Sequence, residues 1–192
     1  MIITIARQCG CGAFHVGKIL AENYGVPFYT RQNLMEMADK NGVIAEMDDF
    51  FEERPVDELL FSFSSSLEDA RENITAKPLK ILSEMIGTDD CIIIGRCGNH
   101  IFRKRNDLIS VFLKGDIDLR IENIKEKHKF SIAKATEFVH NVDDCRITYH
   151  KYYTGLTWGN AVDYDICLDS CRLGTEQTAN MIEQYVYNLN IK

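Results

Sequence analysis

Residues 1–20, MIITIARQCGCGAFHVGKIL, are the stretch around which the fold is organised. The apolar run at residues 2–6 predicts a buried strand, residues 8–12 form a glycine-containing turn, and Val16 and Leu20 then lie at helical spacing. Glycine adopts backbone angles that other residues avoid. A helix N-terminus directs several N–H groups at one point, where an anion can bind. This layout is typical of a phosphate-binding loop.

The match to the Walker A pattern, G-x-x-x-x-G-K-[ST], is imperfect. Gly12 is followed by Ala13 and Phe14. Position 13 therefore has no lysine to reach the β- and γ-phosphates, and position 14 has no hydroxyl to hold Mg²⁺. Lys18 is a full turn further on, and we expect it to point elsewhere. Taken alone, the stretch is equally consistent with an ordinary strand-to-helix turn that binds nothing.

Composition and charge limit the functional classes. The chain has 192 residues and a net charge of −7, which suits one globular domain and argues against a broad nucleic-acid-binding face. Any anionic ligand must then be held by a local cluster of arginines. No apolar run approaches the roughly 20 residues that span a bilayer. We expect a cytoplasmic protein with no membrane or nucleic-acid partner.

The chain contains seven cysteines, an odd number that fits free thiols in a reducing compartment better than disulfides. Cys9 and Cys11 form a C-x-C sequence beside the glycine turn. Because no second Cys/His pair accompanies them at zinc spacing, we expect no metal ligands from the protein here.

The remaining sequence alternates apolar runs with helical patterns. This alternation predicts an α/β fold with a parallel sheet flanked by helices. Residues 43–66 are acidic and irregular, and we expect broken helices and a mobile loop there. The expected strands after the first are residues 26–29, 91–94, 108–113 and 164–168, and the expected later helices are 31–40, 74–86, 116–127, 132–153 and 175–189.

Ligands of parallel sheets bind at the carboxyl ends of the strands. This rule brings together residues 7–12, Arg96 and residues 114–116. Arg96 follows a buried run and Gly95, and a guanidinium there serves a ligand or a buried carboxylate; we favour the ligand. Arg120 lies one turn into the next helix, where the alternative is a surface ion pair with Asp116.

A second polar segment lies near the end of the predicted helix 132–153. Asp143 and Arg146 are three residues apart and share a helix face, which Tyr149 extends. Such a set can form a nucleotide cradle, with arginine on phosphate and the aromatic ring on base or sugar. The alternative is a helix-surface salt bridge that contributes a few tenths of a kcal/mol.

These motifs together resemble the cytidylate kinase-like family, a branch of the P-loop nucleoside monophosphate kinases. The last of them is the most specific, and the resemblance is weak between residues 43 and 87. The motifs are Ile3-Thr4-Ile5-Ala6-Arg7-Gln8 with Gly10-x-Gly12 and Gly17-Lys18, Pro27-Phe28-Tyr29, Ile94-Gly95-Arg96, Val111-Phe112-Leu113 with Arg120, and Asp143-x-x-Arg146-x-x-Tyr149-x-x-x-Tyr153-Thr154-Gly155-x-x-Trp158-Gly159 followed by Tyr164-Asp165.

The resemblance implies one P-loop nucleotide kinase-like domain over residues 1–192. It implies a helical acceptor-binding insertion at about 43–87 and a lid region at about 128–158. The implied activity is ATP-dependent phosphoryl transfer to a nucleoside monophosphate, CMP or dCMP, with Mg²⁺. Such transfer depends on positioning and charge stabilisation, which arginines from several segments provide.

The resemblance also assigns roles to individual residues. Arg96 would hold the acceptor phosphate, Arg120 would reach the ATP side, and Arg146 with Asp143 would belong to the acceptor and lid region. The catalytic set is therefore Arg96, Arg120 and Arg146, and the nucleotide-binding set is Arg7, Gly10, Cys11, Gly12, Ala13, Phe14, Asp143 and Tyr149.

The chain also departs from the family pattern. Ala13 stands where cytidylate kinases have lysine and this family commonly has glycine, and Phe14 stands where a basic residue or histidine is frequent. Ala6 replaces the usual first glycine, and Cys145 replaces a frequent arginine. Each change removes charge or backbone freedom from the phosphate site. Three hypotheses remain open: a nucleoside monophosphate kinase, a nucleotide-binding protein without turnover, and a kinase for another phosphate acceptor.

Overall fold

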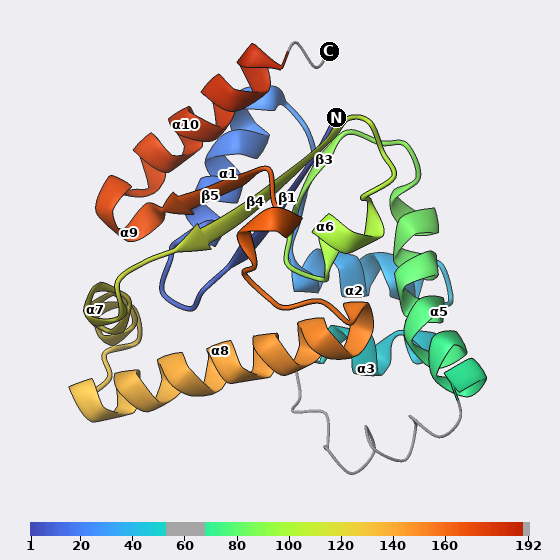
Figure 1. Ribbon diagram of the computed structural model, residues 1–192, viewed down its shortest axis with the longest axis horizontal. Coiled ribbons are helices and arrows are strands. Elements are labelled where there is room, and N and C mark those ends of the chain that lie inside the picture. Colours follow the sequence, from blue (N-terminus) through green and yellow to red (C-terminus); the bar gives the residue numbers. More distant parts are fainter. Residues whose placement is uncertain (53–67, 190–192) are drawn as a thin grey trace.

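The computed structural model describes residues 1–52 and 68–189, and the side chains of residues 1–52 and 75–189. A five-stranded parallel sheet with the order β2-β3-β1-β4-β5 forms the centre of the molecule (Figure 1). Ile5 of the central strand is in register with Ile94 on one side and Val111 on the other. The predicted α/β fold with a parallel sheet is thus confirmed. The strands are β1 (Ile2–Arg7), β2 (Phe28–Tyr29), β3 (Cys91–Ile94), β4 (Leu108–Lys114) and β5 (Ile166–Asp169).

Helices cover both faces of the sheet and bury its apolar strands on both sides. On one face α1 (Ala13–Tyr24) packs beside α10 (Thr175–Asn188). The other face is covered by α2 (Arg31–Lys40), α5 (Glu68–Ile86) and α6 (Gly98–Ile101). Alternate residues of β1 enter the two cores, Ile3 and Ile5 in the first and Ile2 in the second.

The carboxyl ends of the strands face two further helices, α7 (Ile117–His128) and α8 (Ile132–Thr154). Figure 1 shows α8 running along this edge of the sheet. Apolar side chains of both helices pack with Cys9 of the loop after β1. The shorter elements are η1 (Ile44–Glu46), α3 (Asp48–Phe51), η2 (Ala161–Asp163) and α9 (Ser170–Leu173).

Local sequence signals explain several boundaries. The Thr30 side chain caps α2 by accepting from the Asn33 backbone N–H, and the Asn33 side chain accepts from the Thr30 backbone N–H, which makes a capping box. Gly25 ends α1 in the left-handed conformation, as its position predicts. The segment after α8 turns at Gly155 and returns over the sheet, where Trp158 packs edge-on against Phe112.

The start of one helix was predicted wrongly. The sequence predicts residues 74–86 with Pro78 near the start, because proline is common in the first turn. The helix α5 begins at Glu68, and Pro78 lies inside it. Leu82 and Ile86 pack in the core, and this packing offsets the hydrogen bond that proline cannot donate.

The predicted broken helices of residues 43–66 are present as η1 and α3; the rest of that prediction, residues 53–66, lies outside the described residues. No helix of the described part is long and apolar enough to cross a membrane.

Candidate active site

The loop between β1 and α1 leaves the start of α1 open. Gly10 and Gly12 have φ values of 87° and 67°, and a Cβ at Gly10 would lie 2.6 Å from the carbonyl oxygen of Arg120. Both positions therefore require glycine. Gly12 is also the N-cap of α1, and no side chain of the described residues caps this helix. Its first N–H groups are available to an anion.

Two helices hold this loop through one carboxylate. Asp143 accepts a hydrogen bond from the Cys9 backbone N–H at 2.7 Å and another from Arg120 Nη1 at 2.5 Å. Arg120 is 7% exposed and also donates to the carbonyls of Gly115 and Cys9. The surface pair of Arg120 with Asp116 does not form, because the Asp116 side chain caps α7. Arg120 therefore fixes the loop.

Arg146 extends from α8 to the end of β1. Its Nη1 donates to the carbonyl of Arg7 at 3.2 Å and lies 3.8 Å from the Asp143 carboxylate. Asp143 and Arg146, which the sequence predicts to pair within α8, are thus further apart than Asp143 and Arg120. Arg146 lines the same cavity as Gly95 and Arg96, which follow β3.

The turn after β3 is strained. Gly95, Arg96 and Cys97 have φ values of 71°, 54° and 54°, so three consecutive residues are left-handed. This conformation costs roughly 1–2 kcal/mol for each residue that has a Cβ. At Gly95 the missing Cβ leaves room for the Arg7 guanidinium against the backbone. Backbone strain of this kind concentrates at functional sites.

The strained turn directs Arg96 inward, where it contacts α3. Its Nη1 donates to the carbonyls of Phe50 at 2.8 Å and Phe51 at 3.0 Å. The Tyr149 hydroxyl donates to the same Phe50 carbonyl at 3.0 Å, and the Arg96 guanidinium lies 5.0 Å from the Tyr149 ring centroid. Arg96 thus binds backbone carbonyls of α3, a short helix in the region where the sequence predicts broken helices.

Arg7, Arg96 and Arg146 line one small cavity at the carboxyl edge of the sheet. Its volume is about 20 Å³, which is room for one water molecule. The described residues that line it include no carboxylate. His150 and Thr4 also line it, each with a buried polar atom that has no hydrogen-bond partner among the described residues. Burial, with a smaller contribution from His100, lowers the pKa of His150 to about 4, so this imidazole is neutral at pH 7.

The predicted site residues thus fall into three groups. Arg7, Arg96, Arg146 and Tyr149 line the cavity, Arg120 and Asp143 hold the loop, and Gly10, Cys11, Gly12, Ala13 and Phe14 make up the loop and the start of α1. The Cys11 and Ala13 side chains are buried in the core, whereas Phe14 is half exposed. Sequence reasoning missed Asn123, whose side chain donates to the Gly10 carbonyl at 2.9 Å, because no motif marks it.

Comparison with known proteins places this geometry in a family. Residues 2–172 match the sequence profile described as the cytidylate kinase-like family. The chain belongs to this family. A protein named cytidylate kinase from Methanosarcina mazei is 25% identical over 188 residues, covering 95% of this chain and 94% of the relative.

Solved structures agree with the fold of a cytidylate kinase-like protein. An uncharacterized protein from Eubacterium ventriosum superposes with a TM-score of 0.76 at 27% identity, covering 98% of both chains. Shikimate kinase from Acinetobacter baumannii superposes with a TM-score of 0.53 at 14% identity, covering 100% of this chain and 95% of the other. A gluconokinase from Sinorhizobium meliloti superposes with a TM-score of 0.52 at 14% identity, covering 97% and 94%. The fold is that of the P-loop kinases, and with the family it supports nucleotide kinase activity.

Mg²⁺ does not find protein ligands in the loop of this cytidylate kinase-like chain. Mg²⁺ prefers carboxylate, phosphate and water oxygens. Residues 8–14 carry no hydroxyl or carboxylate side chain, and Asp143 is bonded to Arg120 and Cys9. The side chains of this loop therefore supply no ligand for Mg²⁺.

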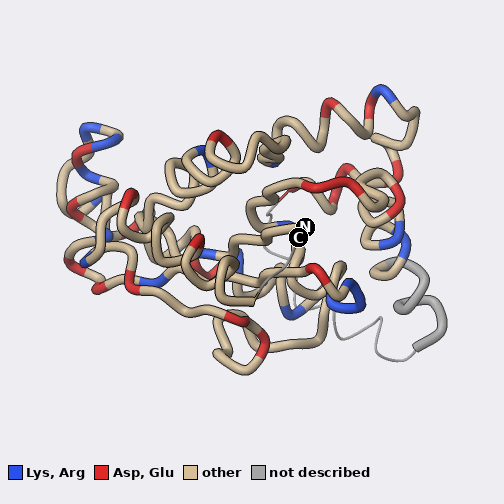
Figure 2. Tube along the Cα trace, turned by 90° about the horizontal axis from the view of Figure 1, so that it is seen from above, with Lys and Arg blue, Asp and Glu red and all other residues tan. Residues whose placement is uncertain are grey.

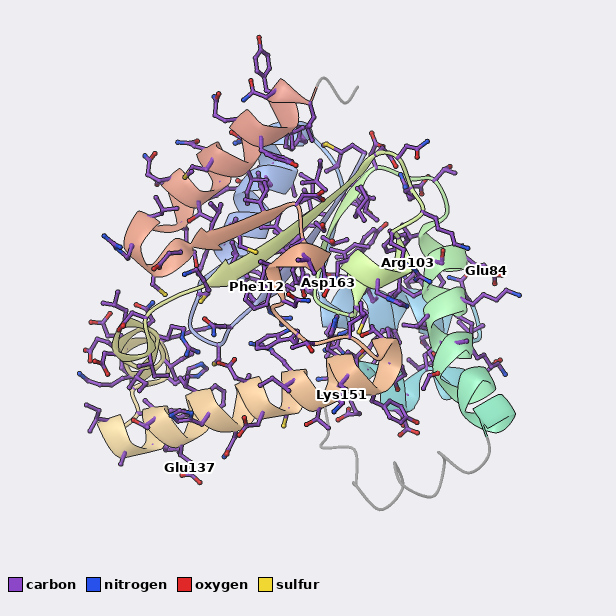
Figure 3. All side chains as sticks on the ribbon, viewed as in Figure 1. Glu84, Arg103, Phe112, Glu137, Lys151 and Asp163 are labelled. Atoms are coloured by element: carbon purple, nitrogen blue, oxygen red, sulfur yellow. The ribbon has the colours of Figure 1, made fainter. Side chains whose placement is uncertain are left out.

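A second cavity lies outside the part of the fold that forms the loop. Its volume is about 360 Å³, and Arg103 after α6 and Asp163 of η2 are among its lining residues (Figure 3). No residue of the loop 8–14 lines it.

Figure 2 shows lysine and arginine interspersed with acidic residues along the described trace. The arginines that line the small cavity are thus a local cluster in an acidic protein, as the composition predicts.

Proposed function

We propose that this protein transfers the γ-phosphoryl group of ATP to a nucleoside monophosphate, with CMP and dCMP as the first candidates. The observation that carries the proposal is the convergence of Arg7, Arg96 and Arg146 on one cavity at the carboxyl edge of the sheet. Such a set attracts anions and suits phosphoryl transfer, which needs positioning and charge stabilisation. The open N-terminus of α1 lies at the same edge of the sheet.

Each part of the site has a distinct role in this proposal. The backbone N–H groups of residues 10–14 bind the ATP phosphates, since no side chain there is cationic. Arg146, beside the end of β1, neutralises charge on the transferred group. Arg96 holds the acceptor phosphate. Arg120 is a positioning residue, because its Nη1 lies 2.5 Å from the Asp143 carboxylate, whereas Nη1 of Arg146 lies 3.8 Å from it.

Acceptor binding requires a rearrangement. A cavity of about 20 Å³ cannot hold a nucleotide, and Arg96 is bonded to the carbonyls of Phe50 and Phe51. An acceptor phosphate would replace these carbonyls at Arg96 and release α3. In this proposal, the insertion at about 43–87 binds the acceptor, and the region at about 128–158, which contains Arg146 and Tyr149, is the lid.

The second candidate function is nucleotide binding without turnover. It is favoured by the loop, which lacks both the lysine and the hydroxyl of the Walker pattern at residues 13 and 14. It is also favoured by Arg120, whose pairing with Asp143 leaves less positive charge for the γ-phosphate.

One experiment distinguishes the two functions. The protein is incubated with ATP and Mg²⁺ and, in turn, CMP, dCMP, UMP, AMP and GMP, and ADP formation and thermal shift are both measured. Turnover with one acceptor supports the kinase, and a thermal shift without turnover supports the binding protein. Arg146→Ala should abolish the turnover, while Arg103→Ala, an exposed arginine outside the small cavity, should not. Equal activity of both variants would contradict the assigned site.

A further inference from the structure

Two thiols meet beside the phosphate loop. Cys11 Sγ in the loop lies 3.9 Å from Cys171 Sγ on α9, although 160 residues separate them in the chain. Both are free thiols. Cys171 Sγ is also 3.8 Å from the Gly10 carbonyl, and the neighbouring Ser170 hydroxyl donates to the Cys11 carbonyl at 2.9 Å. The segment after β5 therefore touches the loop through both backbone and sulfur.

We propose that Cys11 and Cys171 form a reversible disulfide when the protein meets a peroxide. A disulfide requires an S–S distance of about 2.0 Å, so the two sulfurs must approach by about 2 Å. Side-chain rotation and a small shift of the loop supply this movement, because the sulfurs are already neighbours. The bond would connect the phosphate loop covalently to α9.

The exposure of the two thiols sets the order of the reaction. Cys171 is partly exposed, whereas Cys11 is 3% exposed. The Cys171 thiolate attacks one oxygen of hydrogen peroxide, the O–O bond breaks, and hydroxide leaves and is protonated to water. The Cys11 thiol then loses its proton and attacks the sulfenic sulfur of Cys171. The S–S bond forms, the S–O bond breaks and a second water leaves, so two thiols are oxidised and one peroxide is reduced.

The resting form at neutral pH is the dithiol. Burial raises the pKa of the Cys11 thiol to about 12, and burial also raises that of Cys171. Thiolate is the reactive species, so both thiols react more slowly than an exposed cysteine. The pair therefore responds to sustained rather than brief exposure to oxidant.

The disulfide would change nucleotide binding, and this consequence rests on the proposed function. The loop N–H groups bind phosphate only while they point at one site. Drawing Cys11 toward α9 displaces the residues on both sides of it, Gly10 and Gly12. We expect the oxidised protein to bind ATP at least tenfold more weakly than the reduced protein.

Mass spectrometry tests the bond directly. The full-length protein is treated with hydrogen peroxide, alkylated with N-ethylmaleimide and digested with trypsin without reduction. The expected product joins peptide 8–18, which contains Cys9 and Cys11, to peptide 152–172, which contains Cys167 and Cys171. Fragmentation must place the bond at Cys11 and Cys171, and dithiothreitol must remove it. Oxidation of Cys167 without this cross-link, or a bond between other cysteines, would overturn the proposal.

Variants separate the two steps. Cys171→Ser should abolish the cross-link, and Cys11→Ser should leave Cys171 as a sulfenic acid that dimedone traps. Cys167→Ser, a partly exposed thiol on β5, is the matched control and should keep the cross-link. ATP affinity is measured on the reduced and oxidised forms. A reduced protein that does not bind ATP contradicts the proposed function alone, whereas a cross-linked protein with unchanged ATP affinity contradicts the effect on binding.

Discussion

Asp143 on α8 joins Cys9 of the phosphate loop to Arg120 of α7. It accepts from the Cys9 N–H at 2.7 Å and from Arg120 Nη1 at 2.5 Å. The side chains of Asp143 and Arg120 are 14% and 8% exposed, so the ion pair is largely removed from water. One carboxylate thus determines where the loop lies relative to both helices.

Asp143→Asn should destabilise the protein and weaken ATP binding. Removing one partner of a buried ion pair leaves an uncompensated charge on Arg120, at a cost of roughly 3 kcal/mol. Urea unfolding and calorimetric titration with ATP measure the two effects. Asp144→Asn, an exposed neighbour on the same helix, is the control and should match the wild type. Equal stability of the two variants would show that the pair does not hold the loop.

Arg96→Lys should reduce turnover by about 10³-fold, because lysine cannot present the planar fork that binds a phosphate through two hydrogen bonds. Tyr149→Phe distinguishes the loss of the Arg96 guanidinium from weaker docking of α3. It removes one hydrogen bond to the Phe50 carbonyl, at a cost of about 1 kcal/mol, but leaves the guanidinium in place. Steady-state kinetics of both variants, with circular dichroism as the folding check, should show a much larger loss of turnover in Arg96→Lys than in Tyr149→Phe.

Phe14→Arg should strengthen ATP binding about tenfold. Phe14 is 50% exposed at the start of α1, so a longer cationic side chain can reach the loop without entering the core. A hydrogen bond from a charged donor contributes roughly 1.5–3 kcal/mol. Phe14→Gln removes the ring in the same way but adds no charge. If isothermal titration finds the same ATP affinity for the glutamine and arginine variants, the phosphates do not lie near residue 14.

Stability should fall as the pH is lowered from about 6.5 to about 4. The folded-state pKa of His150 is about 4 against the ordinary histidine value of 6.5, so the unfolded chain binds a proton in this window that the folded chain does not. At about 1.4 kcal/mol per pKa unit, the loss approaches 3 kcal/mol. Burial lowers the pKa of His100 as well, which adds to the loss.

Urea unfolding between pH 7.5 and 4.5 measures this dependence. His150→Gln cannot titrate at residue 150, so its stability should change less steeply with pH than that of the wild type, with His100 contributing to the remainder. Identical slopes for the two proteins would exclude a neutral buried imidazole at residue 150.

The sheet and most helix boundaries were predictable because their signals are local. The apolar run before Gly95 identifies β3, and Thr30 and Gly25 act within one turn of the helix ends that they specify. Pro78 misled the prediction of α5 because packing at Leu82 and Ile86 outweighs a local preference. A prediction from local residue preferences therefore fails where tertiary packing compensates for an unfavourable residue such as Pro78.

Residues of the candidate site could be identified from the sequence, but the groups that they contact could not. Of the arginines that line the cavity, Arg7 and Arg96 were expected at the carboxyl edge, since strand ends in a parallel sheet converge there, whereas Arg146 was expected only from its spacing to Asp143. The partners were not expected: Arg120 binds a carboxylate 23 residues away, and Arg96 binds carbonyls 45 and 46 residues before it. Such contacts depend on how α3 and α8 pack, and no spacing in the sequence encodes that packing.

The length of α8 between Asp143 and Tyr149 sets the distance between the two parts of the site that these residues contact. Asp143 is fixed to the phosphate loop and Tyr149 to the Phe50 carbonyl, and six residues of helix separate these anchors by about 9 Å. A residue inserted between them would turn one anchor by about 100° relative to the other. The two sides of the site would then lose their common alignment while each stayed intact. We therefore expect this interval to tolerate substitution on its exposed face but no change in length.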